Sequence, residues 1–239
     1  MARILTLLLL TWMTISFSGC VQHSNIIETN PIGKVYEDAI TLREMTLPLP
    51  EGKGVVVGRG PSDSGNYLQI CLNKVVDDQI HAAIFIIRDS ATTEYTGYKP
   101  IKAFKRDDIL YSTSKKKMSG RGQDGWYINH IRLSFSGTKT RANKEALQYI
   151  KDNKLVLPGN FIMTSHVFTG TSNTSKFLRY SVYINPDLEG IRPTSEADWA
   201  ASEWNILKIN KHPEKLEYIE KTKEEGAAFH QKLKAAFGS

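Results

Sequence analysis

The chain has 239 residues, of which 41% are hydrophobic and 23% are charged, and its 31 basic and 25 acidic side chains leave a formal net charge of +6. This length is sufficient for one substantial domain with its own core, and the composition is that of an ordinary globular protein. The positive charge is spread along the sequence and no nucleic-acid-binding motif accompanies it. These features argue against a nucleic acid as a partner.

The N-terminus has the pattern of an export signal. One positive charge, Arg3, precedes an apolar run from Ile4 to Ile15 that only threonines interrupt. A membrane-spanning helix needs about 20 apolar residues, so this run is too short for a permanent span. Small residues follow the run, which completes the order of charged, apolar and small-residue regions that is typical of a signal peptide.

The signal ends at a cysteine. Phe17-Ser18-Gly19-Cys20 resembles the lipobox of bacterial lipoproteins. This resemblance implies that residues 1–19 are removed, that a diacylglycerol is joined to the Cys20 thiol, and that the new N-terminus is acylated, for example with palmitate. Two or three acyl chains hold a protein almost permanently in a membrane. A plain secretory signal with an incidental cysteine is the alternative interpretation.

The residues after the cysteine bear on the location of the protein. Val21 stands where the lipoprotein family usually has an acidic residue when the protein stays in the inner membrane. The resemblance therefore implies a cell-envelope protein that is anchored in the outer membrane and faces the periplasm. Residues 20–35 include Asn30-Pro31 and show neither helical nor strand period, which predicts a flexible tether. Residues 36–239 are predicted to form a single domain.

The domain is expected to be α+β, with a mainly antiparallel sheet of about eight strands and about three helices. Alternating and β-branched runs predict strands, in chain order, within residues 40–50, 53–60, 67–75, 79–89, 125–135, 160–170 and 176–186. Asp77 and Asp78 predict a hairpin turn, and the polar segment 171–175 predicts another. Consecutive strands with few helices between them favour an antiparallel sheet over a parallel one.

Three segments have helical patterns. Residues 141–153 place apolar side chains at helical spacing, and Ser195 predicts the N-cap of a second helix that runs to about residue 208. Pro213 predicts the first turn of a C-terminal helix that packs on the sheet. Its apolar stripe, weakest around residues 224–226, consists of Leu216, Ile219, Phe229, Leu233 and Phe237.

No motif in the sequence predicts catalysis. The glycines within residues 52–65 lack the spacing of a dinucleotide-binding or phosphate-binding loop, so a strand and a turn account for them. The six histidines form no zinc-binding pair, and Cys71 alternates with apolar neighbours, as a buried structural cysteine does. We therefore predict no catalytic residue, no metal and no cofactor.

The most usable surface signal is a basic segment. Its side chains are Lys99, Lys102, Lys105, Arg106, Lys115, Lys116, Lys117 and Arg121. Clustered positive charge attracts phosphate and carboxylate groups, and each residue contributes on the order of 1 kcal/mol near an anionic membrane. These residues form the candidate binding site for an anionic envelope ligand, and a solvated loop is the alternative. Trp126 would either stand beside them as an aromatic platform or pack within its strand.

Three functions stay open. Residues 47–60 and 204–226 resemble segments of bacterial lipoproteins of unassigned function, and this resemblance implies no activity. The first function is a non-catalytic binding or structural domain, with the membrane and an envelope component as partners. The second is binding of an anionic ligand through residues 99–121. The third is a periplasmic hydrolase, which requires His81, His130 or His166 in a cleft beside a serine, a cysteine or a carboxylate.

Overall fold

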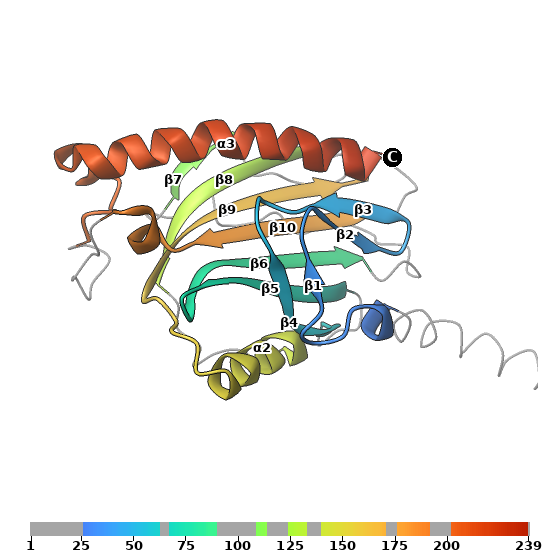
Figure 1. The fold of residues 1–239 in the computed structure, drawn as a ribbon. Coiled ribbons are helices and arrows are strands. Elements are labelled where there is room, and N and C mark those ends of the chain that lie inside the picture. Colours follow the sequence, from blue (N-terminus) through green and yellow to red (C-terminus); the bar gives the residue numbers. More distant parts are fainter. Residues whose placement is uncertain are drawn as a thin grey trace, which may run out of the picture.

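A large antiparallel sheet forms the centre of the fold, with a long helix on one of its faces and a shorter helix on the other (Figure 1). The computed structural model describes residues 26–62, 67–89, 109–113, 124–132, 140–170, 176–191 and 202–238. It confirms the predicted α+β class, with a mainly antiparallel sheet and a C-terminal helix that packs on it.

Eight strands form the main sheet in the order β1-β4-β5-β6-β10-β9-β8-β7. Their bounds are β1 Val35–Tyr36, β4 Gly54–Pro61, β5 Tyr67–Val76, β6 Gln79–Asp89, β7 Ile109–Ser112, β8 Asp124–Arg132, β9 Asn160–Thr169 and β10 Phe177–Ile184. The helices are α2 Arg141–Asp152 and α3 Pro213–Gly238, with short 3-10 helices η3 Pro186–Glu189 and η4 Ile209–Lys211.

Alternation along the strands separates two layers of core. In β5, Leu68, Ile70 and Leu72 are buried on the face that α3 covers, whereas Cys71 lies on the opposite face among α2 side chains. This is the period of two that an extended chain imposes on its side chains. The core under α3 is the larger one, because it also includes the apolar side chains of a separate sheet formed by β2 Ala39–Leu42 and β3 Met45–Pro48.

The predicted hairpin turn at Asp77-Asp78 is confirmed. Both residues have positive φ, at 48° and 60°, which is the conformation that a two-residue hairpin loop needs to match the twist of its strands. Asparagine and aspartate tolerate this left-handed region better than most residues. Val76 lies opposite Gln79 next to the turn and Tyr67 lies opposite Asp89 at the far end of the hairpin, and the register shifts once between them, at a β-bulge between Lys74 and Val75.

Two strand predictions need correction. Residues 40–50 form two strands, β2 Ala39–Leu42 and β3 Met45–Pro48, which pair with each other in a sheet of their own. The chain reverses at Arg43, whose φ is 59°, and arginine gives no turn signal in sequence. Strands β1 and β7 were not predicted, since both are too short to show a period.

The predicted tether over residues 20–35 is wrong for its second part. Residues 26–29 form a helical turn, and Ile26 and Asn30 are buried. The Arg59 guanidinium on β4 donates to the backbone carbonyls of Ile27 and Asn30. These bonds join positions far apart in the chain, so they leave no periodic pattern in the sequence. For this reason the sequence predicts a flexible segment, although the segment packs on the sheet.

The helix predicted from Ser195 to residue 208 is not present where the structure describes it. Residues 202–208 form turns that lead into η4, and Asn205 accepts a hydrogen bond from the backbone of Leu207. Asparagine side chains compete with helical hydrogen bonds in this way. The C-terminal helix begins at Pro213, as predicted.

Helix α2 forms where the sequence predicts it. Thr140 caps its first turn by accepting from the backbone N–H of Asn143 at 3.4 Å. Ala142 and Ala146 face β4, and a Cβ atom at Gly58 would lie well inside van der Waals contact with the backbone carbonyl of Ala142. Gly58 lies at a β-bulge, where β4 bends and the helix approaches its backbone.

We predict that Gly58→Ala lowers the free energy of unfolding by about 1–3 kcal/mol, since the added methyl group overpacks the contact with α2. Gly159→Ala is the matched control, because a Cβ atom there has no atom within 4 Å and the change should stay within about 1 kcal/mol. Urea denaturation followed by circular dichroism measures both. Equal stability of the two variants would contradict the close approach.

Candidate functional site

A stripe of buried residues on α3 contains more polar side chains than the sequence pattern suggests. It consists of Lys215, Tyr218, Ile219, Thr222, Gly226, His230 and Leu233, at helical spacing. Leu216, which the sequence placed on the stripe, is partly exposed instead. Because buried polar groups need partners, the groups that face this stripe are the candidate functional site.

The apparent weak point of the stripe at residues 224–226 is a place of close contact with the sheet. A Cβ atom at Gly226 would lie 2.6 Å from a ring carbon of Trp126, so only glycine leaves room for the indole. Trp126 is buried and also packs on Tyr111, with 4.9 Å between ring centroids. The strand-packing role of Trp126 is therefore confirmed, and its ring sets the distance between α3 and β8.

A chain of hydrogen bonds runs from the rim of the sheet into this contact. Asp124 on β8 accepts from His230 on α3, with 2.7 Å between Oδ1 and Nε2. The Nδ1 atom of His230 lies 3.1 Å from Nδ1 of His166 on β9. Lys234 lies one turn further along α3, and its ammonium group lies 2.5 Å from the other oxygen of Asp124. The carboxylate, the lysine and the two imidazoles form one connected cluster.

The hydrogen bonds assign the tautomers of the two imidazoles. A carboxylate accepts, so Nε2 of His230 carries the proton and its Nδ1 is an acceptor when the ring is neutral. The Nδ1 atom of His166 must then donate, which leaves its Nε2 as a bare acceptor. This Nε2 is buried without a hydrogen-bond partner, and so is the hydroxyl of Tyr180, which lies opposite His166 on β10.

Burial keeps both imidazoles neutral. It lowers the pKa of His166 to about 3, with a further contribution from the nearby His230. Burial also lowers the pKa of His230, and it outweighs the opposing hydrogen bond and charge of Asp124. Burial raises the pKa of Asp124, but the hydrogen bonds from Lys234 and His230 outweigh it, so the pKa is lower than usual. The cluster therefore holds one carboxylate, one ammonium group and two neutral rings at pH 7.

A second group fixes the start of α3. Lys215 is fully buried, and its ammonium group lies 2.8 Å from a carboxylate oxygen of Glu203 and 5.4 Å from the ring centre of Trp204. The indole of Trp204 in turn stacks on His130 of β8 at 6.0 Å. His130 also contacts Asn160 on β9, with 3.2 Å between Nε2 and Oδ1. This group joins α3 and the segment before it to the sheet.

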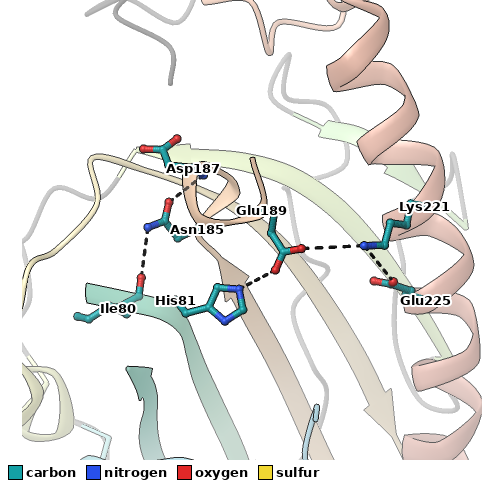
Figure 2. A network of polar contacts seen from close by, with 7 residues as sticks. All are labelled: Ile80, His81, Asn185, Asp187, Glu189, Lys221 and Glu225. Atoms are coloured by element: carbon teal, nitrogen blue, oxygen red, sulfur yellow. Dashed lines mark hydrogen bonds and ion pairs between the residues drawn. The ribbon is translucent and has the colours of Figure 1, made fainter. Parts of the chain in front are cut away.

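A third group of polar side chains connects the middle of α3 to η3 and to β6 (Figure 2). Glu189 lies between His81 and Lys221, at 2.6 Å from the imidazole and 3.9 Å from the ammonium group. Lys221 also lies 3.7 Å from Glu225, one turn further along α3. Asn185 accepts from the backbone of Asp187 at 3.1 Å, which positions the turn that presents Glu189. Exposed pairs of this kind contribute little to stability each.

The three histidines that the hydrolase hypothesis requires thus lie in three different groups. His81 does reach a carboxylate, that of Glu189, whereas His130 stacks on Trp204 and His166 pairs with His230. His166 is 0% exposed and His230 is 5% exposed, so this pair lies in the core beneath α3 and not in a cleft. Its geometry fits a role in holding the helix.

Cys71 behaves as the sequence predicts. It is a free, buried cysteine between β5 and α2, and its thiol lies 3.8 Å from the amide oxygen of Asn143. Burial, with a smaller contribution from Glu145, raises the pKa of the thiol. The thiolate that would act as a nucleophile is therefore disfavoured.

Other predicted site residues lie outside the described part of the chain. These are Cys20 and the basic residues Lys99, Lys102, Lys105, Arg106, Lys115, Lys116, Lys117 and Arg121. Among the residues that are described, no group of three or more His, Cys, Asp or Glu side chains is arranged to hold a metal ion.

Sequence reasoning missed the α3 clusters. The signal that could have found two residues is their position on the apolar stripe, with His230 three residues before Leu233 and Lys215 four residues before Ile219. Asp124 and Glu203 carry no such signal, because each is defined by a partner from another element.

Comparisons with protein-family models, with curated proteins and with solved structures found no match. Within the described ranges, none of the helices is both long enough and apolar enough to cross a membrane.

We predict that Glu203→Gln lowers the free energy of unfolding by about 3 kcal/mol, because it weakens the closest partner of a fully buried ammonium group. Glu214→Gln is the matched control. Its carboxylate lies 3.5 Å from the same Nζ atom and is half exposed, so the loss should be much smaller than for Glu203→Gln. Urea unfolding monitored by tryptophan fluorescence measures both variants. A Glu214→Gln variant as unstable as Glu203→Gln would contradict this assignment.

Proposed function

We propose that this protein is a lipid-anchored lipoprotein of the bacterial cell envelope, whose α+β domain has a binding or structural role and not a catalytic one. The sequence Phe17-Ser18-Gly19-Cys20 supports the anchor, and Val21 supports residence in the outer membrane on its periplasmic side. Cys71 is free and buried, which leaves Cys20 available for lipid rather than for a disulfide within the domain.

The proposal of a non-catalytic role is supported by the positions of the titratable side chains under α3. His166, His230 and Lys215 are buried in contacts that hold α3 and its lead-in segment on the sheet. A general acid or base must instead reach a substrate through hydrogen bonds of about 3 Å. The geometry therefore favours a rigid scaffold that is carried to its place by the lipid.

The packed N-terminal segment supports close attachment of the domain. Residues 26–30 are fixed on β4 by Arg59, so only residues 21–25 separate the proposed lipid-bearing cysteine from the domain. The six Cα–Cα steps from Cys20 to Ile26 can span at most about 20 Å. In Figure 1 the blue helical turn at residues 26–29 lies beside β4 near the start of α2, so we infer that this end of the domain is held nearest the membrane.

The lipid anchor is tested by metabolic labelling in a bacterial host. We expect the wild-type chain to incorporate labelled palmitate and to lose residues 1–19, because the lipid is joined at Cys20. Cys20→Ser should abolish the label, since a hydroxyl does not accept the diacylglycerol transfer that the lipoprotein family performs on the thiol.

Cys71→Ser is the matched control and should keep the label, because the Cys71 thiol is buried in the folded domain. Mass spectrometry of the N-terminal peptide identifies the first residue of the mature chain and the mass of its lipid. A label that persists in Cys20→Ser, or a wild-type chain without label, would contradict the proposal.

A further inference from the structure

The His166–His230 pair tolerates one added proton but not two. If His230 gains a proton, it donates to both Asp124 and His166, provided that His166 moves its own proton from Nδ1 to Nε2. After a second proton, both Nδ1 atoms carry hydrogen and face each other at 3.1 Å. The hydrogen bond is then lost, and two cations oppose each other in a buried site.

The surroundings of the pair offer little compensation. The described charged and titratable groups that face it are Asp124 from β8, Lys234 from α3 and Tyr180 from β10. Asp124 already pairs with Lys234, and burial keeps the hydroxyl of Tyr180 neutral by raising its pKa. Aromatic rings fill the remaining contacts, with Trp126 stacked on His166 at 5.6 Å and Phe168 stacked on His230 at 4.7 Å.

We propose that the His166–His230 pair is an acid-sensitive latch, which holds the C-terminal half of α3 on the sheet and releases it when both rings are protonated. The latch joins two elements that are far apart in sequence and adjacent in space, namely β9 and the last element of the chain. It does not depend on the proposed lipid anchor or on the absence of catalysis.

Release of this half-helix is possible without dismantling the sheet. The backbone hydrogen bonds of α3 are internal to the helix, and those of β8, β9 and β10 are made within the sheet. The contacts that would be lost include those of Phe229, His230, Leu233 and Phe237 with the main sheet and the β2–β3 sheet. The ion pair of Lys234 with Asp124 would also be lost. Release therefore uncovers an apolar aromatic surface that includes Phe168 and Tyr180.

The sign of the pH dependence follows from burial. Both rings have a pKa below the ordinary value of 6.5 while α3 is docked, and that of His166 is about 3. Released rings titrate near 6.5, so the released state binds more protons below that pH. The docked state of α3 therefore has its full stability above about pH 6.5, and it becomes less stable as the pH falls toward 3. The equilibrium constant for release rises up to about tenfold per pH unit for each extra proton.

Native-state hydrogen exchange of the full-length chain in detergent tests the latch. Between pH 6.5 and 4.5, corrected for intrinsic exchange rates, we expect amides of residues 229–237 to lose protection on the order of 100-fold, since at least one extra proton is bound on release. Amides of β5 and β6 should keep their protection over the same range. Equal loss in α3 and in β5–β6 would indicate global acid unfolding and would overturn the latch.

Two variants assign the effect to this pair. His166→Asn places a non-titrating amide donor near the Nδ1 position, so we expect the acid response of residues 229–237 to flatten. His212→Gln is the matched control, because His212 lies 4.0 Å from Glu203 and Glu214, at the start of α3, and its loss should leave the response unchanged. A full response in His166→Asn, or a lost response in His212→Gln, would contradict the proposal.

A measurement on the wild-type chain keeps the test independent of how the variants fold. Long-range proton–nitrogen NMR spectra report which ring nitrogen carries hydrogen. At pH 7.5 the latch requires hydrogen on Nε2 of His230 and on Nδ1 of His166. Any other tautomer pair, or an imidazolium at either site at pH 7.5, would overturn it.

Discussion

The contact between α3 and the sheet is the constraint on which the rest of the structure depends. The helix buries a stripe that contains an ammonium group, a hydroxyl and an imidazole, on Lys215, Thr222 and His230. Each such group, if left without a partner in the core, costs several kcal/mol or shifts to its neutral form. The sheet and the segment before α3 therefore have to present matching groups at fixed distances along 26 residues of helix.

The matching groups come from different parts of the chain. Thr222 donates to the backbone of its own helix at 2.8 Å, whereas Lys215 uses Glu203 and His230 uses Asp124 and His166. Because the partners lie on β8, β9 and the turn before η4, these polar contacts also fix where α3 begins, how it rotates and which ring lies under Gly226. A purely apolar stripe would specify burial but would leave rotation and register less well determined.

Most of the sheet could be predicted from sequence, because its central strands alternate strongly and are separated by turn residues. β5 and β6 with Asp77-Asp78 between them are the clearest case. The missed elements are those whose pattern is too short or whose turn residue is unusual, such as β7 or the reversal at Arg43. The clusters under α3 could not be predicted, since His166 and His230 are 64 positions apart and Asp124 and His230 are 106 apart.

Glycine shows why the same signal can be misread. In sequence, Gly58 marks the end of a β-branched run and Gly226 marks a weak point in an apolar stripe. In the structure, a helix and the sheet approach each other closely at both positions, with the glycine on the strand for α2 and on the helix for α3. A single sequence shows the missing side chain at such a position, but it does not show the backbone or ring that occupies the space.

The contacts of α2 and of α3 with the sheet are stabilised by different kinds of interaction. Beneath α2, the core includes Val57, Cys71, Ala142, Ala146 and Ile150, and apolar burial of this kind changes little with pH. Beneath α3, part of the contact is made by groups whose charge depends on protonation, with neutral histidines beside Asp124 and a charged Lys215 beside Glu203. The stability of that contact therefore follows proton binding as well as buried area. Of the two helices that cover the sheet, α3 is thus the one whose contact with the sheet can respond to pH.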